Sequence, residues 1–130
     1  MRILLVDDER HVRRALARSL EAADHTVVES ESGLGTLDLL DRAHFCLLVL
    51  DVNLPDMSGW EVLRTAQSRR MEIPPVIVIS GIAPSVARQE EFRPFGVLHK
   101  PFPLESLHRL AALAASWPRA NRNSAEELDA

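Results

Sequence analysis

Apolar residues along this chain gather in short runs that alternate with longer segments of mixed polarity. The runs predict five strands, at Ile3–Val6, Thr26–Val28, Leu47–Leu50, Val76–Ile79 and Val97–Leu98. The first, third and fourth runs are continuous Val, Ile and Leu without a polar residue at every second position. Strands of a parallel sheet read this way because helices cover both faces of the sheet. The pattern therefore predicts a parallel sheet buried between helices.

The segments between these runs place apolar residues three and four positions apart, as amphipathic helices do. In the first segment the predicted apolar stripe consists of Val12, Ala15, Leu16, Ser19 and Leu20. Further helices are predicted around Leu37–Ala43, Val62–Ala66, Val86–Phe92 and Leu104–Ala114. The third of these five helices should begin near Ser58, because Glu61 three residues later completes a capping box. Alternating strands and helices with right-handed crossovers give a (βα)₅ α/β fold of three layers.

The length of 130 residues corresponds to one domain. We expect that domain to span residues 1–116. From Trp117-Pro118 onward the chain turns polar, so residues 117–130 are predicted to form a loose C-terminal tail, in which Ser124 and Glu127 could cap one helical turn.

Composition narrows the classes of function. The chain is 46% hydrophobic and carries a net charge of −4, and its basic residues form only pairs such as Arg13-Arg14. Direct nucleic-acid binding needs a concentrated basic face, so it is not expected. No apolar run approaches the ~20 residues of a membrane span, and the apolar start is too short for a signal peptide. We therefore expect a cytoplasmic protein without a membrane segment, in which the single Cys46 is a buried, inert thiol.

Polar residues of particular kinds occupy the predicted strand ends. Asp7 and Asp8 end the first strand, Asp51 the third and Ser80 the fourth, and Lys100 follows the fifth. In open α/β sheets the functional crevice lies at the carboxyl ends of the strands, so these side chains should meet there. Any one of them alone would more often be a turn or surface residue. Their joint occurrence at four strand ends indicates a site.

Three neighbouring carboxylates repel one another by about 4 kcal/mol per pair at ~4 Å and an effective dielectric near 20. A cation is needed to keep them ionised, and Mg²⁺ suits an all-oxygen site that also admits phosphate oxygens. Lys100 adds a fixed positive charge and Ser80 a hydroxyl. This equipment indicates phosphoryl transfer, with an acyl phosphate formed on Asp51.

The combination of motifs resembles the response-regulator receiver family of two-component signalling. The resemblance covers residues 1 to about 116 and rests on four segments, Val6-Asp7-Asp8-Glu9, Leu50 to Gly59, Ile79-Ser80-Gly81 and Lys100-Pro101-Phe102. It implies a flavodoxin-like, five-stranded parallel sheet in the order 2-1-3-4-5. It also implies a cis bond before Pro101 and a positive φ at Gly59.

The resemblance assigns a role to each site residue. Asp51 would be the phospho-acceptor, while Ser80 and Lys100 would bind phosphoryl oxygens. Asp8 and Asp51 would bind Mg²⁺ through their side chains, Asn53 through its backbone carbonyl, and Asp7 directly or through water. The implied partners are a histidine kinase or phosphotransfer protein and an unidentified downstream protein. The partner surface would comprise the fourth helix, the fifth strand and the fifth helix, through which a homodimer could also form.

The chain departs from the family at Val97, where an aromatic ring usually swings inward on activation; this chain contains no Tyr at all. Gly81 should leave the phosphoryl pocket open, and we expect Ser80, Gly81 and the following loop to transmit the signal instead. We interpret Trp60 as a half-buried packing residue. These departures leave the predicted acceptor chemistry untouched.

Two functions of other classes stay open. A docking domain that works without phosphorylation would agree with Val97 but not with the retained acidic residues and Lys100. A Mg²⁺-dependent phosphohydrolase with an Asp nucleophile would resemble the haloacid dehalogenase class, but Asn53 stands where that class has its acid/base Asp. The sequence thus favours a signalling domain over an enzyme.

Overall fold

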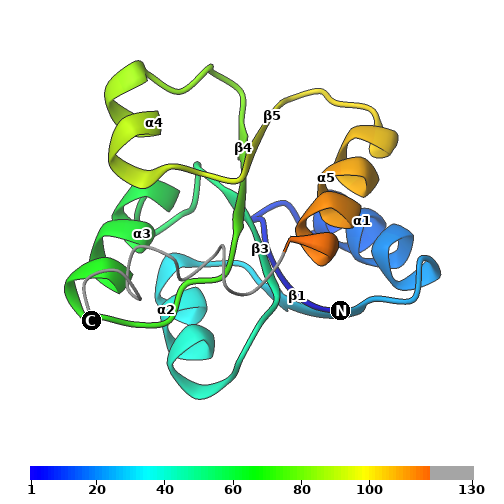
Figure 1. Ribbon diagram of the computed structural model, residues 1–130, viewed down its shortest axis with the longest axis horizontal. Coiled ribbons are helices and arrows are strands. Elements are labelled where there is room, and N and C mark those ends of the chain that lie inside the picture. Colours follow the sequence, from blue (N-terminus) through cyan, green and yellow to red (C-terminus); the bar gives the residue numbers. More distant parts are fainter. Residues whose placement is uncertain (118–130) are drawn as a thin grey trace.

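The computed structural model describes residues 1–117, in which five strands and five helices alternate along the chain (Figure 1). The strands are β1 (Arg2–Val6), β2 (Thr26–Ser30), β3 (Leu47–Asp51), β4 (Val76–Ser80) and β5 (Gly96–His99). The helices are α1 (Arg10–Ala22), α2 (Gly33–Arg42), α3 (Gly59–Ser68), α4 (Val86–Phe92) and α5 (Leu104–Ser116). The predicted tail, apart from Trp117, lies outside the described residues.

All neighbouring strands pair in parallel, in the order β2-β1-β3-β4-β5. Helices α1 and α5 lie on one side of the sheet, and α2, α3 and α4 lie on the other (Figure 1). This is the three-layer flavodoxin-like arrangement expected from the sequence, so the predicted fold class is confirmed. The register sets Val6 beside Ser30 and Leu50, and Ser80 beside His99, so the carboxyl ends of the strands share one edge.

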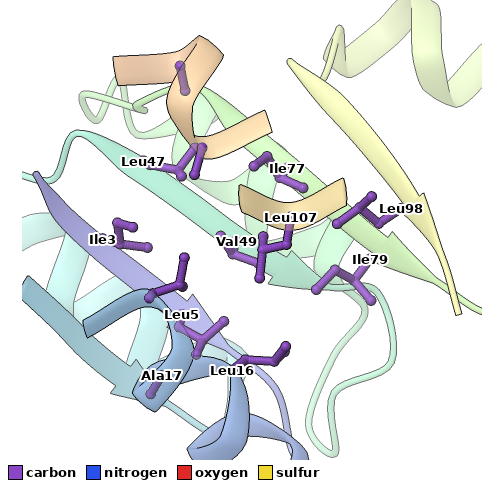
Figure 2. Close-up of a cluster of buried hydrophobic side chains, with 13 residues drawn as sticks. Ile3, Leu5, Leu16, Ala17, Leu47, Val49, Ile77, Ile79, Leu98 and Leu107 are labelled. Carbon is purple, nitrogen blue, oxygen red and sulfur yellow. The ribbon is translucent and has the colours of Figure 1, made fainter. Parts of the chain in front are cut away.

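Each face of the sheet has its own apolar core. Figure 2 shows the core beneath α1 and α5, where Leu16 and Leu107 meet residues of the central strands such as Ile3, Val49 and Ile77. The other core packs Leu40, Trp60 and Leu63 against the opposite side chains of the same strands. Every residue of β3 and β4 is buried, which explains why their sequences are continuous rather than alternating.

The apolar stripe of α1 differs from the prediction. Val12 is 36% exposed and Ala15 is also exposed, whereas Leu16, Ala17 and Leu20 are buried. The helix is rotated so that Arg13, with a side chain only 11% exposed, lies on the inner side toward Glu29 of β2. A salt bridge between α1 and β2 therefore takes the place that the sequence analysis gave to an apolar contact.

Two smaller predictions are also wrong. Gly59 does not have a positive φ; it is the first residue of α3, and a Cβ there would lie 2.7 Å from the backbone oxygen of Asp51. Gly59 is needed for close approach rather than for an unusual dihedral angle. Cys46 is half-buried rather than buried. The Ser58 cap is confirmed, because its hydroxyl accepts the Glu61 N–H at 3.1 Å, and the bond between Lys100 and Pro101 is cis as expected.

Helix α4 is short and lies loosely on the rest of the domain. None of its seven residues is buried. Phe92 stacks on Trp60 of α3 with 5.4 Å between ring centroids, and Arg64 of α3 pairs with Glu91 at 3.2 Å. Within residues 1–117, no helix combines the length and the apolar character that crossing a bilayer requires.

Candidate metal centre and acceptor carboxylate

The carboxyl edge of the sheet brings the predicted acidic residues together. Asp7 follows β1 directly, and Asp51 is the last residue of the neighbouring β3. Ligand oxygens of Asp7, Asp8 and Asp51 all lie within 4.8 Å of one another. Asp7 and Asp51 are buried, whereas Asp8 is exposed. The cluster is therefore open to solvent on the Asp8 side.

Lys100 reaches this cluster from the end of β5. Its Nζ donates to Asp51 Oδ2 at 2.7 Å and lies 3.6 Å from Asp7 Oδ2. Burial by itself would lower the pKa of Lys100, but the hydrogen bond to Asp51 and the charges of Asp51 and Asp7 outweigh burial and raise it. The ammonium group is thus charged and fixed against the carboxylate predicted as the acceptor.

The carboxylate of Asp51 is held at both oxygens. Oδ1 accepts the backbone N–H of Asn53 at 2.9 Å, and Oδ2 accepts from Lys100. The backbone after it is fixed as well, because the Val52 N–H donates to the Ile79 carbonyl at 3.0 Å. With 2% of its surface exposed, Asp51 has a defined orientation toward the other two carboxylates.

Asp7 combines complete burial with an unused acceptor. Its Oδ1 accepts the Glu9 N–H at 2.8 Å, while Oδ2 is buried and has no hydrogen-bond partner among residues 1–117. Burial is the main reason that the pKa of Asp7 is raised above its ordinary value, followed by the neighbouring acidic groups, and the Glu9 N–H and Lys100 offset this only in part. Buried polar atoms are rarely left without a partner, so this oxygen is a candidate cation ligand.

The residues present fit a hard divalent cation. Three carboxylates and one ammonium group leave a net negative site, and an orphaned carboxylate oxygen points into it. An all-oxygen ligand set suits Mg²⁺, which keeps several waters and needs only one or two carboxylates. The predicted contribution of the Asn53 backbone carbonyl is not tested by these contacts and stays a prediction.

Ser80 ends β4 next to β3, but its hydroxyl is occupied locally. The Oγ donates to the Ile82 carbonyl at 2.5 Å and accepts the Ile82 N–H at 3.1 Å. A Cβ at Gly81 would have no neighbour within 4 Å, so the loop is open at this point. The predicted contact of Ser80 with a phosphoryl oxygen would require its hydroxyl to leave the Ile82 carbonyl.

A hollow of about 290 Å³ lies at the carboxyl edge of the sheet, beside the ends of β3 and β4. Its lining includes Asn53, Trp60, Ser80, Gly81, Ile82 and Arg88. Trp60 is 7% exposed, so it packs more deeply than the half-buried position we expected. The Arg88 guanidinium lies 5.8 Å from the Trp60 ring centroid, which brings α4 to the rim of the hollow.

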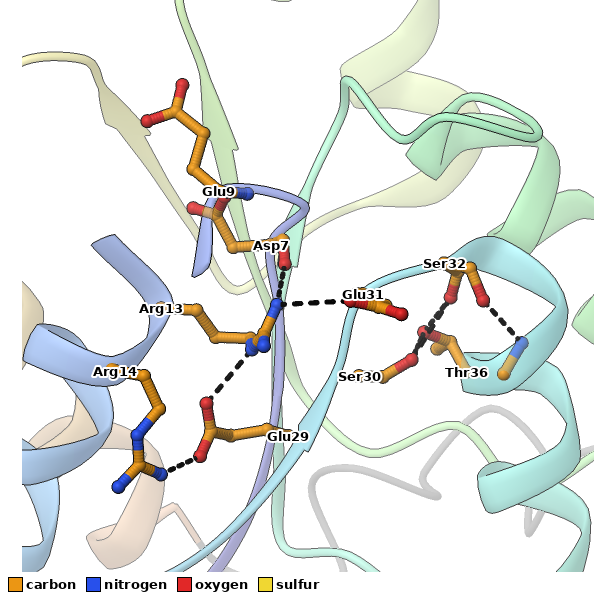
Figure 3. A network of polar contacts seen from close by, with 10 residues as sticks. Asp7, Glu9, Arg13, Arg14, Glu29, Ser30, Glu31, Ser32 and Thr36 are labelled. Carbon is orange, nitrogen blue, oxygen red and sulfur yellow. Dashed lines mark hydrogen bonds and ion pairs between the residues drawn. The ribbon is translucent and has the colours of Figure 1, made fainter. Parts of the chain in front are cut away.

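The sequence analysis missed two residues that shape this region. Arg13 donates to the backbone carbonyl of Asp7 at 2.9 Å, as part of the polar network in Figure 3. Asp56 accepts the N–H groups of Gly33 and Leu34 at 2.8 and 2.9 Å and so caps α2. Positions 13, 16, 17 and 20 form a second helical stripe, but the sequence alone does not decide which of the two stripes of α1 faces the sheet.

Comparison with known proteins agrees with the observed fold. The model of the family described as "Response regulator receiver domain" matches residues 3–112. The chain therefore belongs to the response-regulator receiver family, whose members are signalling domains of two-component systems. The predicted family is thus confirmed.

The curated relatives include cell cycle response regulators CtrA of Brucella ovis and Brucella abortus. Each is 34% identical over 83 residues, which is 64% of this chain and 35% of the relative. The chain thus spans about a third of the length of these relatives.

Solved structures share the fold. The response regulator TrrA from Thermotoga maritima, in complex with Mg²⁺ and BeF, has a TM-score of 0.76 at 22% identity, over 87% of this chain and 97% of that one. CheY4 from Vibrio cholerae has a TM-score of 0.78 at 23% identity, over 87% of this chain and 97% of that one. A receiver domain from Methanospirillum hungatei has a TM-score of 0.74 at 26% identity, over 83% of this chain and 88% of that one.

Proposed function

We propose that this receiver accepts a phosphoryl group on Asp51 from a phosphohistidine of a histidine kinase or phosphotransfer protein, in a Mg²⁺-dependent reaction. The observation that carries the proposal is the buried Asp51 carboxylate, held 2.7 Å from Lys100 beside Asp7 Oδ2, an oxygen that accepts no hydrogen bond from residues 1–117. Family membership and a Mg²⁺–BeF complex of the relative TrrA give it further support. A cytoplasmic location remains part of the proposal.

The residues divide the chemistry among them. Asp7, Asp8 and Asp51, with the Asn53 carbonyl, would hold Mg²⁺, which when bound neutralises charge on the carboxylates and on the incoming phosphoryl oxygens. A carboxylate oxygen of Asp51 attacks phosphorus as the P–N bond to the donor histidine breaks. The freed imidazole nitrogen leaves with its electron pair and takes up a proton from solvent.

Lys100 and Ser80 act on the transferred group. Lys100 is already bound to Asp51, so its ammonium group would move by a short distance to pair with a phosphoryl oxygen. The Ser80 hydroxyl would exchange its Ile82 carbonyl acceptor for another phosphoryl oxygen. That exchange would pull on residues 81–85, which connect β4 to α4, and so alter the proposed partner surface of α4, β5 and α5.

The test uses a small-molecule phosphodonor, acetyl phosphate, with and without Mg²⁺. We expect the intact mass to rise by one phosphoryl group only when Mg²⁺ is present, and not at all in Asp51→Asn. The matched control is Asp56→Asn, which alters an acidic residue of the same loop outside the cluster and should still be phosphorylated.

Absence of any mass gain in the folded wild-type protein would contradict the proposal. That result would favour the alternative hypothesis, a docking domain that works without phosphorylation. Release of phosphate from added phosphomonoesters would instead favour the phosphohydrolase.

A further inference from the structure

We propose that Arg13 is a positioning residue for the metal site, because it fixes the Asp7–Asp8 backbone in the orientation that lets both carboxylates bind Mg²⁺. This inference rests on the proposed function, since it concerns the same cation. It assigns a role in that site to a residue of α1 that touches neither the cation position nor the acceptor carboxylate.

The first step is an inventory of the polar atoms of Asp7. Its N–H donates to the Ser30 carbonyl at 3.1 Å, and its Oδ1 accepts the Glu9 N–H. Its carbonyl accepts from Arg13 Nη1 at 2.9 Å. Only Oδ2 is left without a hydrogen bond, and it faces Lys100. The neighbours of Asp7 thus leave one atom without a hydrogen bond, and that atom belongs to the acidic cluster.

The second step concerns how Arg13 itself is held. Its Nε donates to Glu29 Oε1 at 2.9 Å, while Nη1 reaches the Asp7 carbonyl, so one planar guanidinium joins β2 to the end of β1 (Figure 3). Glu31 adds a weaker contact at 4.0 Å, and Arg14 binds the second oxygen of Glu29. The fixed fork of an arginine can serve two acceptors in one plane, which a lysine ammonium on a flexible stem cannot do equally well.

The third step connects this clamp to metal binding. The carbonyl of Asp7 and the N–H of Asp8 belong to one planar peptide unit. If Arg13 is lost, a buried carbonyl loses its partner, and the peptide unit turns toward water to recover a hydrogen bond. Because that turn changes ψ of Asp7 and φ of Asp8, it displaces both acidic side chains. Mutation of a group that orients a metal ligand typically weakens metal binding by about 10–100-fold.

Arg14 provides a matched control. It binds the same Glu29, lies next to Arg13 in the sequence and carries the same charge, but its side chain is 46% exposed and its recorded ion pair is with Glu29 rather than Asp7. Loss of Arg14 therefore removes one positive charge and one contact to β2 while leaving the Asp7 carbonyl bonded to Arg13.

The experiment is a Mg²⁺ titration of ¹⁵N-labelled wild type, Arg13→Lys, Arg13→Gln and Arg14→Gln, followed through backbone amide shifts. We expect both Arg13 variants to weaken Mg²⁺ binding by about tenfold and Arg14→Gln by less than about twofold. Without metal, the amide shift of Asp8 should move in the Arg13 variants only. Urea unfolding checks that each variant is folded. If Arg13→Gln does not fold, Arg13→Lys still tests the proposal.

The outcomes separate the two proposals. Wild type that shows no Mg²⁺-dependent shifts would overturn the metal site and this inference together. Wild type that binds Mg²⁺ while Arg13→Lys binds it equally well would overturn the positioning role alone. An equal loss in Arg14→Gln would also overturn it, because the effect would then be one of general charge.

Discussion

Asp7 carries a carboxylate that the fold disfavours when no cation is bound. It is fully buried, and burial is the main cause of its raised pKa. Between the ordinary value of 3.8 and the raised value, the folded protein keeps a proton that the unfolded chain has released. The free energy of unfolding therefore falls as pH rises through this window and stays lowered at higher pH. The ionised Asp7 carboxylate therefore lowers the stability of the metal-free fold.

The first prediction at this scale concerns Asp7→Asn. Asparagine keeps an oxygen for the Glu9 N–H and removes the buried charge, so metal-free Asp7→Asn should be more stable than wild type at pH 7, by on the order of 1 kcal/mol. The gain should shrink as pH falls toward 3.8. Urea unfolding at several pH values with a chelator present measures both effects.

Saturating Mg²⁺ provides the control for this prediction. Wild type should gain stability from the cation, while Asp7→Asn should gain much less. A metal-free Asp7→Asn protein that is less stable than wild type at neutral pH would contradict the interpretation of Asp7 as a disfavoured charge.

Single residues also show what a sequence can predict. Asp7, Asp51, Ser80 and Lys100 could be placed because each stands at a strand end, and parallel strands end at one edge. Arg13 could not, because the rotation of an amphipathic helix about its axis depends on contacts with other elements. Two apolar stripes were compatible with the α1 sequence. The structure has the stripe that buries Ala17, and in this rotation of the helix Arg13 forms its salt bridge with Glu29.

At the scale of elements, helix α2 begins on a support from elsewhere in the chain. Ser32 provides a local cap by accepting the Gly35 N–H, and Asp56 from the loop between β3 and α3 accepts the two preceding N–H groups. These bonds to backbone N–H groups lower the pKa of Asp56. The loop that follows Asp51 at the end of β3 is thereby tied to α2.

We predict that Asp56→Ala loosens this tie. Amide exchange at Gly33 and Leu34 should accelerate, and the melting temperature should fall by roughly 3–5 °C. The lowered pKa means that Asp56 contributes stability above its ordinary value of 3.8 and loses it as pH falls further through the folded-state value. Wild type and variant should therefore converge in strong acid, and a difference that persists there would exclude the carboxylate as the cause.

Elements were more predictable than their exact contacts. All ten strands and helices of residues 1–117 lie where the apolar pattern indicated, and α4 has the predicted bounds. The tie between Asp56 and α2 was not foreseen, because a hydrogen bond between residues 23 positions apart leaves no local pattern. Gly59 was misinterpreted for the same reason, since its close neighbour is the Asp51 backbone across a turn.

At the scale of the whole molecule, the question is how phosphorylation of Asp51, if it occurs as proposed, would alter the proposed partner surface of α4, β5 and α5. Val97 of β5 has no ring to swing inward, and it pairs with Val78 of β4. The alternative route runs through Ser80 and its bonds to Ile82, at the start of the loop that leads to α4. Under this hypothesis the ring is not needed for activation.

The prediction is that Val97→Tyr leaves the activation response unchanged. Beryllofluoride with Mg²⁺ should alter amide exchange in residues 81–92 to the same extent, within about twofold, in wild type and Val97→Tyr. An increase in the response well beyond that range would show that the ring restores a missing step. Light scattering on the same samples tests the proposed homodimer, which should form or strengthen with beryllofluoride.

The loose attachment of α4 has a consequence for how this protein can change over generations. None of its seven residues is fully buried, and only Phe92 packs against the core beneath α3, where its ring stacks on Trp60. Substitutions on its outer side therefore leave the folding of the sheet almost unaffected, whereas substitutions in β3 or β4 do not. If α4 is part of the partner surface, as we propose, selection can change partner preference through α4 without altering the residues of the proposed phosphoryl chemistry.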